Sequence, residues 1–400
     1  MQIRFTPNKL ILFLMIIFPI STIYQGIGIF ENLNRVIVFG LMGLMVGSYF
    51  VESIRQIDFW WLVFVIILSV VCIVLTDGMP YFINCYVFFP FWVVFFVYIT
   101  KNYEYIMEKT CEGTRLLQVV IIIWEVTVFI SFFFKRCYVA EWGDVYFQSF
   151  SSAPHRFAST CLIIMAYAFI LYLVTSKSLY LLHLVLPMVG LFVGGARTYL
   201  AIGIVFLFAM FYIWCPKKKY FYISFVPLLL LLVLIISVTP IATKIKNTLA
   251  GNGYYGYWAT LTNGRSIFWG EDLIGYWNLS PIKKLVGNGA NFVYDLNIAG
   301  TAGRKLWAHN DFINLLCSNG LLGLLLYFAT FFSFVSSKMK KYKGSFIPMF
   351  AFYFICGFNA FFNMLYSYTS AVIGIPYILF ALYTLPNEIE RYKESKEKNS

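Results

Sequence analysis

The chain consists mostly of long apolar segments separated by short polar ones. Runs of about 18 or more residues with few charges recur from one end to the other, and this pattern is typical of helices that cross ~30 Å of hydrocarbon. We therefore expect an all-α polytopic integral membrane protein. About twelve transmembrane helices are predicted, near residues 10–30, 35–51, 59–76, 81–99, 116–134, 157–176, 179–196, 198–214, 221–240, 311–335, 346–364 and 365–385.

One non-apolar segment is much longer than the others. Residues 241–308 separate the first nine predicted spans, in residues 1–240, from the last three, in residues 309–385. Residues 386–400 form a polar tail. We expect the long segment to be one large exoplasmic loop.

This loop contains one amphipathic pattern. Trp269, Leu273, Tyr276 and Trp277 recur at helical spacing, which predicts a helix lying in the membrane interface. Asn263 is placed to be the N-cap of that helix.

Composition agrees with a membrane location. The 400 residues are 60% hydrophobic and 12% charged, whereas a soluble domain carries about 25% charge. The formal charge of +12 comes from basic residues between the spans, where they orient a membrane protein, so we do not expect nucleic acid as a partner. The first run is longer than a signal-peptide core and lacks a small-residue cleavage pattern, and we expect it to be retained.

Basic residues divide unequally between the two predicted sides of the membrane. With the N-terminus in the cytoplasm, cytoplasmic segments hold eighteen of the 30 Lys and Arg residues, and the short outer loops hold only five, Arg35, Lys135, Arg136, Arg156 and Arg197. Positive charge favours the cytoplasmic side. We expect both termini in the cytoplasm.

The cysteines indicate neither disulfides nor a metal site. The eight are scattered, with no CxxC pair and no Cys/His spacing suited to zinc. We expect no metal.

Four basic residues from separate parts of the chain are predicted to meet at the outer face. Arg156 begins the sixth span, Arg197 lies in a tight glycine hairpin, Arg265 lies in the large loop and His309 directly precedes the tenth span. A helix N-terminus favours the neutral imidazole that a general base requires. The alternatives are anchoring or solvated arginines, and a bystander histidine beside a capping Asn310.

Glu125 is the one carboxylate deep inside a predicted span. A buried carboxylate normally has a partner. We favour a structural pair with Arg197 or Arg156, and the alternative is a proton-relay group. His183 is interpreted as an interhelical hydrogen-bonding residue.

Four short motifs occur in one order around the large loop. They are Gly195-Ala196-Arg197-Thr198, Gly264-Arg265-Ser266-Ile267-Phe268-Trp269, Gly287-Asn288-Gly289-Ala290-Asn291-Phe292, and Ala308-His309-Asn310-Asp311-Phe312 followed by Gly320-Leu321-Leu322-Gly323. Together they resemble the O-antigen polymerase and ligase superfamily (Wzy and WaaL). The resemblance covers about residues 150–335.

The resemblance implies a GT-C-like membrane glycosyltransferase of the bacterial inner membrane. Its donor would be an undecaprenyl-diphosphate-linked oligosaccharide, used without nucleotide sugar, cofactor or metal. Arg197 and Arg265 match the family's diphosphate-binding arginines, and His309 matches its catalytic histidine. Arg156 matches an upstream arginine of many members and would also bind the diphosphate. Asn310 and Glu125 would have supporting roles. A chain-length regulator and a flippase are candidate partners besides the lipid bilayer.

Three other functions remain open. A ligase would transfer the glycan to lipid A-core, whereas a polymerase adds it to another lipid-linked repeat, and we favour the polymerase. An oligosaccharide-lipid flippase would be expected to show repeated halves or interrupted helices with polar groups at the midplane. A noncatalytic membrane scaffold is the remaining alternative.

Overall fold

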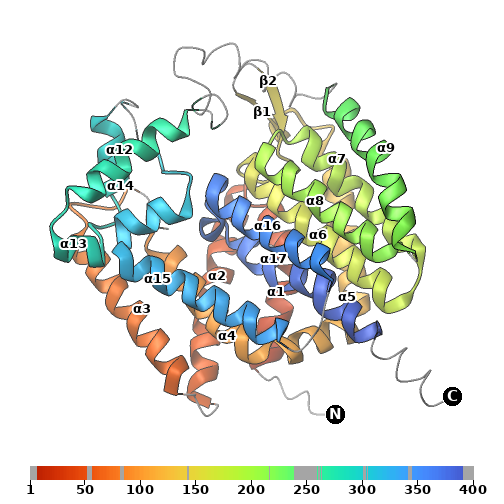
Figure 1. The fold of residues 1–400 in the computed structure, drawn as a ribbon, viewed down its shortest axis with the longest axis horizontal. Coiled ribbons are helices and arrows are strands. Elements are labelled where there is room, and N and C mark those ends of the chain that lie inside the picture. Colours follow the sequence, from red (N-terminus) through yellow and green to blue (C-terminus); the bar gives the residue numbers. More distant parts are fainter. Residues whose placement is uncertain are drawn as a thin grey trace.

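A computed structural model shows a chain built almost entirely of helices (Figure 1). Nine of the helices in its described part are long and apolar enough to cross a membrane. The protein is therefore a polytopic membrane protein of predominantly α-helical structure. The structure describes residues 7–51, 56–81, 85–141, 144–215, 217–237, 259, 262, 264–300, 303, 305–340 and 345–390.

Helical structure coincides with every predicted apolar run. Two of the runs form apolar segments shorter than a full span, Pro7–Ile23 and Ser178–Val193. The elements are α1 (Pro7–Ile23), α2 (Gly28–Val51), α3 (Gln56–Leu75), α4 (Cys85–Glu112), α5 (Thr114–Ser131), α6 (Pro154–Thr175), η2 (Ser178–Leu184) with α7 (Val185–Val193), α8 (Arg197–Trp214), α9 (Lys218–Ser237), α15 (Asp311–Met339), α16 (Phe346–Asn363), and α17 (Thr369–Leu379) with η4 (Phe380–Thr384).

Shorter elements connect these helices. A hairpin of two antiparallel strands, with Val139 opposite Tyr146, follows α5 and was not predicted, because four-residue strands give too short a polar alternation to detect. The connecting elements are η1 (Lys135–Cys137), β1 (Tyr138–Glu141), β2 (Asp144–Phe147), α12 (Arg265–Trp277), α13 (Pro281–Val286), α14 (Phe292–Ala299) and η3 (Leu365–Ser367).

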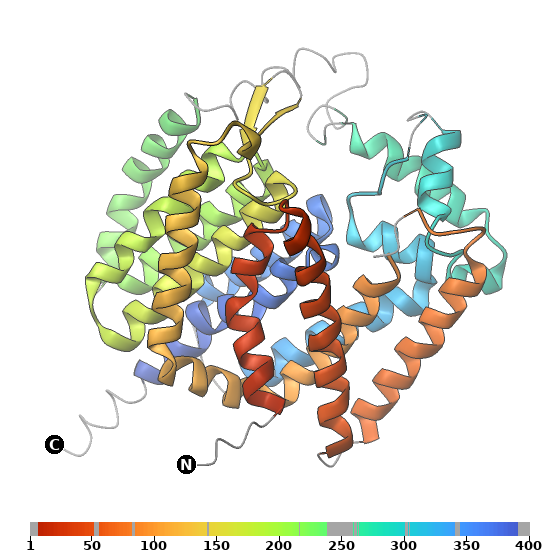
Figure 2. The same ribbon diagram turned by 180° about the vertical axis from the view of Figure 1, so that it is seen from behind.

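The two described ends of the chain lie at the same end of the bundle. Helix α1 begins there and the segment after α17 ends there, whereas the β1–β2 hairpin and α12 lie toward the opposite end (Figure 2).

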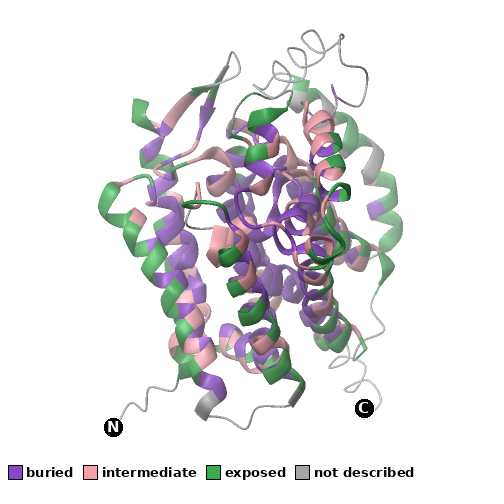
Figure 3. Ribbon diagram, turned by 90° about the vertical axis from the view of Figure 1, so that its left-hand side faces the viewer, coloured by how far each residue is buried: buried purple, intermediate pink, exposed green. Residues whose placement is uncertain are grey.

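Helices α6 and α17 form the centre of the bundle. Both are mostly buried, and they pack against each other. Burial decreases outward, and exposed residues collect on the peripheral helices (Figure 3). On α3, the side chains of Ile66 and Val74 are apolar and exposed. A large apolar surface of this kind is stable where lipid, and not water, surrounds the protein.

Helix α12 was predicted as an interfacial helix, but most of its apolar stripe packs against protein. Trp269 and Tyr276 are buried in a small core with Val293 and Ile313, from α14 and α15. Of the predicted stripe, Trp277 is 65% exposed.

The N-terminus of α12 differs from the prediction. Its N-cap is Gly264, with φ of 81°, and not Asn263, which lies outside the described residues. The Thr262 hydroxyl accepts a hydrogen bond from the backbone N–H of Ser266 at 3.0 Å. A threonine two residues before the N-cap thus provides the capping contact.

Two glycines allow the backbones of α13 and α15 to touch. Gly320 interrupts α15 with φ of 69°, and a Cβ there would overlap the Leu285 carbonyl. Gly287, with φ of 88°, lies against the backbone of Ser318. The Asn288 N–H donates to the Cys317 carbonyl at 2.9 Å. The glycine turn after α13 is thereby fixed to α15.

Replacing Gly320 with alanine is expected to destabilise the protein by ~2–4 kcal/mol, because the new Cβ meets backbone atoms in a left-handed conformation. Thermal unfolding in detergent measures the loss. Gly357→Ala, on α16, is the control, since no atom lies within 4 Å of its Cβ position. Equal melting temperatures for the two variants would contradict the prediction.

Candidate anion-binding site at five helix N-termini

Five helices begin around one region of the molecule. Arg156 lies in the first turn of α6, Arg197 begins α8, Arg265 begins α12, His309 precedes α15 by one cap residue, and Tyr368 is the N-cap of α17. The positive end of a helix dipole favours negative charge. Five such ends together produce a strongly positive region.

Electrostatic contacts show that these residues are neighbours. Arg265 is half-buried and donates a hydrogen bond to the Phe362 carbonyl. Burial lowers the pKa of Arg265 to about 10, the Tyr368 hydroxyl opposes this change, and the Arg197 charge adds to it. Arg265 stays protonated near neutral pH. The charge of Arg197 therefore acts on Arg265, the other predicted phosphate-binding arginine.

A glycine turn positions Arg197, as the hairpin motif suggested. Gly195 has φ of 63°, and a Cβ at this position would overlap the ring of Tyr146. Tyr146 belongs to β2, so the strand hairpin packs directly on the turn. Only glycine fits both the conformation and the space. Arg197 follows two residues later, half-buried at the start of α8.

His309 is held in a conformation unusual for a residue with a side chain. Its φ is 50°, and such left-handed residues concentrate at functional sites. Burial lowers the pKa of His309 well below its usual value near 6.5, and the Arg265 and His155 side chains lower it further. The imidazole is therefore neutral at pH 7, with a lone pair available to accept a proton.

The residues after His309 fix its position. The Asn310 side chain caps α15 by accepting the N–H groups of Phe312 and Ile313, at 3.0 and 3.1 Å. Asp311 is buried and accepts hydrogen bonds from the Tyr327 hydroxyl at 2.8 Å and the Tyr366 N–H at 3.2 Å. Asn310 supports the site as a cap, and Asp311 ties α15 to the segment that carries Tyr368.

Arg197 and Arg265 have no acidic partner in the described part of the chain, and Arg156 interacts with the charge of Glu31 without forming a salt bridge. None of Arg156, Arg197 and Arg265 forms a salt bridge with a carboxylate there, and Arg156 donates instead to the Ser152 hydroxyl at 2.6 Å. Partly buried guanidinium groups without counter-ions are costly. An anionic ligand would remove this cost, and phosphate matches the geometry of arginine.

Tyr368 is a site residue that the sequence did not single out. It interacts with both Arg156 and Arg265, and its ring lies 6.2 Å from that of His155 and 6.3 Å from that of Tyr199. The one signal in the sequence is the polar run of residues 367–370 between two apolar runs. The apolar pattern conceals this break, because the predicted spans 346–364 and 365–385 are continuous.

Glu125 belongs to a different part of the structure. Both of its carboxylate oxygens lie 2.9 Å from Nδ1 of His183, on η2. The expectation that Arg197 or Arg156 is its partner was wrong, because α5 presents this residue to η2 and not to the helix N-termini. The two side chains are 21% and 27% exposed, and the contact agrees with the interpretation of His183 as an interhelical hydrogen-bonding residue.

Asp272 is a buried acid on α12, near the site. Its Oδ2 has no hydrogen-bond partner among the described residues, and the amide of Asn297 is 3.5 Å from Oδ1. Burial raises the pKa of Asp272 to about 7, and the neighbouring Glu271 raises it while Asn297 opposes the change.

Comparisons with known proteins leave the site to be interpreted from its own residues. The chain matches no family model, no curated protein and no solved structure. Within the described ranges, no three His, Cys, Asp or Glu side chains are grouped closely enough to hold a metal ion. The available chemistry is that of arginine, histidine and tyrosine side chains and helix N-termini.

Replacing Glu125 with leucine is expected to lower stability by ~1–2 kcal/mol, because His183 then lacks its partner inside the membrane. Replacing both Glu125 and His183 with leucine should recover most of the loss, since no polar group is left unpaired. A double-mutant cycle of thermal unfolding measures the coupling. Additive losses would show that the two residues do not act as a pair.

Asp272 makes stability depend on pH. The pKa of Asp272 is higher in the folded than in the unfolded chain. Its contribution to the free energy of unfolding is therefore largest below about pH 4, and it falls by up to ~4 kcal/mol as the pH rises to about 7. In Asp272→Asn this dependence should disappear. The measurement is the difference in melting temperature between pH 5 and pH 7.5, and an equal difference in both proteins would rule out this role.

Proposed function

We propose that the protein is a metal-independent membrane glycosyltransferase. It polymerises oligosaccharide repeats linked to undecaprenyl diphosphate into O-antigen or a related surface polysaccharide, at the exoplasmic face of a bacterial inner membrane. The observation that carries the proposal is the pair of neighbouring arginines without an acidic partner in the described residues, Arg197 and Arg265, beside the neutral His309. This set of groups suits a diphosphate leaving group and a hydroxyl nucleophile.

Arg197 and Arg265 bind the donor diphosphate. The repulsion between them is relieved when phosphate oxygens lie between the two guanidinium groups. As the bond from the sugar C1 to the diphosphate oxygen breaks, negative charge develops on the leaving group. Arginines already in position stabilise this charge without reorganising, which lowers the barrier.

His309 accepts the proton of the acceptor hydroxyl. The acceptor oxygen forms a bond to C1 of the donor sugar, the C1–O bond to the diphosphate breaks, and polyprenyl diphosphate departs. The hydroxyl proton moves to the imidazole, which becomes positively charged beside the departing anion. General base catalysis of this kind typically contributes ~10²–10⁴-fold.

The membrane location supports a lipid-linked donor. Sugars activated as nucleotides are made in the cytoplasm, so a transfer at the outer surface needs a donor that has already been activated and carried across. A lipid-linked diphosphate meets both requirements. A ligase would use the same donor and the same three residues, and would differ in the acceptor.

Replacing His309 with alanine is expected to reduce glycan transfer by ~10²–10⁴-fold, because the hydroxyl loses its base. In a strain from which the gene has been deleted, a polymerase defect leaves core carrying a single repeat on a polysaccharide gel. A ligase defect leaves bare core, and a flippase defect leaves bare core with repeats trapped on the inner leaflet. Plasmid-borne His309→Ala should fail to restore the ladder.

Membrane-fraction immunoblots must show normal amounts of the variant. Arg265→Gln should give the same defect, whereas Arg136→Gln, which removes a charge from the exposed η1 segment, should restore a normal ladder. A wild-type ladder from His309→Ala would refute the role of the histidine.

A further inference from the structure

A polar cavity lies beside Tyr368, next to the site described above. It is lined by residues of α1, α2, α4, α6 and the start of α17, and has a volume of about 50 Å³. Tyr368 lines this cavity and also interacts with Arg265. Arg197, Arg265 and His309 are not among the lining residues. The cavity is therefore adjacent to these three residues and is not formed by them.

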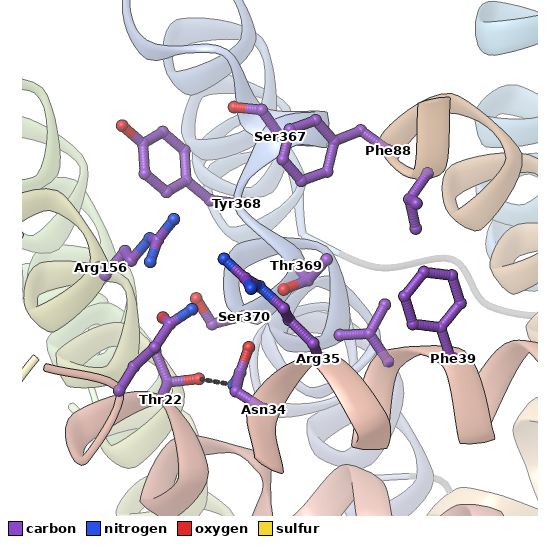
Figure 4. A pocket seen from close by; sticks show the side chains of 13 residues that line it. Thr22, Asn34, Arg35, Phe39, Phe88, Arg156, Ser367, Tyr368, Thr369 and Ser370 are labelled. Atoms are coloured by element: carbon purple, nitrogen blue, oxygen red, sulfur yellow. Dashed lines mark hydrogen bonds between the residues drawn. The ribbon is translucent and has the colours of Figure 1, made fainter. Parts of the chain in front are cut away.

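Two arginines from different helices point into the cavity. Figure 4 shows the guanidinium groups of Arg35, on α2, and Arg156, on α6, directed toward the space beneath Tyr368. Among the described residues, no carboxylate lines the cavity. Two positive charges without an acidic residue in the lining favour an anion between them.

Arg35 is readily available to such an anion. Its present partner is Glu31, one helical turn away at 2.7 Å, and both side chains are close to half exposed. An exposed ion pair of this kind contributes only ~0.2–1 kcal/mol. Exchanging Glu31 for a phosphate costs little, since a phosphate accepts hydrogen bonds from both arginines at once.

The start of α17 adds donors to the same space. Thr369 and Ser370 line the cavity and are the first two residues of this eleven-residue helix, whose N-cap makes no side-chain hydrogen bond. The hydroxyl of Thr369 has no hydrogen-bond partner among the described residues. Free donors at a helix N-terminus bind anions.

The opposite wall of the cavity is apolar and reaches the outer surface of the bundle. Val38, Phe39 and Phe88 form part of it, and Phe39 on α2 is 56% exposed. In a membrane protein, an exposed apolar residue on a peripheral helix contacts lipid. An anion bound by the arginines can therefore remain attached to a chain that lies in the bilayer.

We propose that this cavity binds the phosphate headgroup of a second polyprenyl-linked substrate, the acceptor. The inference rests on the proposed function: a polymerase joins two lipid-diphosphate substrates, of which the donor loses its diphosphate and the acceptor keeps it. Arg197 and Arg265 bind the first diphosphate, and Arg35 and Arg156 bind the second. A ligase would need only the first site for a lipid diphosphate.

The test is the number of polyprenyl diphosphate molecules bound by the purified full-length protein in nanodiscs, measured by native mass spectrometry. Wild type should bind two. Arg35→Gln should bind one, Arg265→Gln should bind one, and Arg35→Lys should retain partial binding at the second site. Arg136→Gln is the matched control for loss of an outer-face arginine and should bind two.

The source of the anion is tested in the same experiment. Competition with inorganic pyrophosphate should displace little lipid from the second site, because the apolar wall adds affinity for the chain. Displacement of the lipid by pyrophosphate at equal concentration would show a site for a free anion and overturn the assignment. Two lipids bound to a folded Arg35→Gln variant would overturn it as well.

A transfer assay separates this inference from the proposed function. Arg35→Gln should raise the KM for the acceptor by about tenfold or more, because a charge-assisted hydrogen bond to the acceptor is lost. The kcat should stay within about twofold of wild type. Transfer with an unchanged acceptor KM refutes the second site and leaves the enzyme assignment standing. Two bound lipids without any transfer would refute the enzyme and leave the lipid site standing.

Discussion

The site is built around arginine charges that no salt bridge neutralises among the described residues. Five helix N-termini meet where Arg156, Arg197 and Arg265 lie, and none of these arginines forms a salt bridge with a carboxylate in the described part of the chain. Each feature favours an anion, and together they make the burial of these charges costly unless an anion binds. Burial, together with the charge of Arg265, keeps His309 neutral. Positive charge and burial together thus favour an anion beside a neutral imidazole.

Backbone packing makes this arrangement rigid. Glycines at positions 287 and 320 bring the turn after α13 against α15, and Gly195 brings the β1–β2 hairpin against the turn before α8. Side chains at these positions would push the elements apart. The glycines of the sequence motifs therefore have a structural role, because they fix helices that begin with Arg197 or follow His309. The motifs combine site residues with glycines because the positions of Arg197 and His309 depend on close backbone packing.

The proposed enzyme has two sites with different roles, one on each side of Tyr368. On one side, Arg265 and His309 interact electrostatically, and on the other, Arg35 and Arg156 line a space with an apolar wall. Tyr368 interacts with arginines of both sites. A reaction between two lipid-linked molecules requires two anchored headgroups close enough for their glycans to meet. In the proposed function, Arg197 and Arg265 bind only one of these two headgroups.

Periodicity and charge in the sequence determined the membrane class, the approximate helices and the residues at helix starts, because a bilayer imposes length and polarity on each segment separately. Tertiary structure decided which of these residues are neighbours. Glu125 pairs with His183 and not with an arginine, and the N-cap of α12 is Gly264 and not Asn263. Tyr368 joins the site through a break between two helices that the apolar pattern concealed. Such contacts depend on how helices rotate and cross, which packing across the whole bundle sets and no single segment encodes.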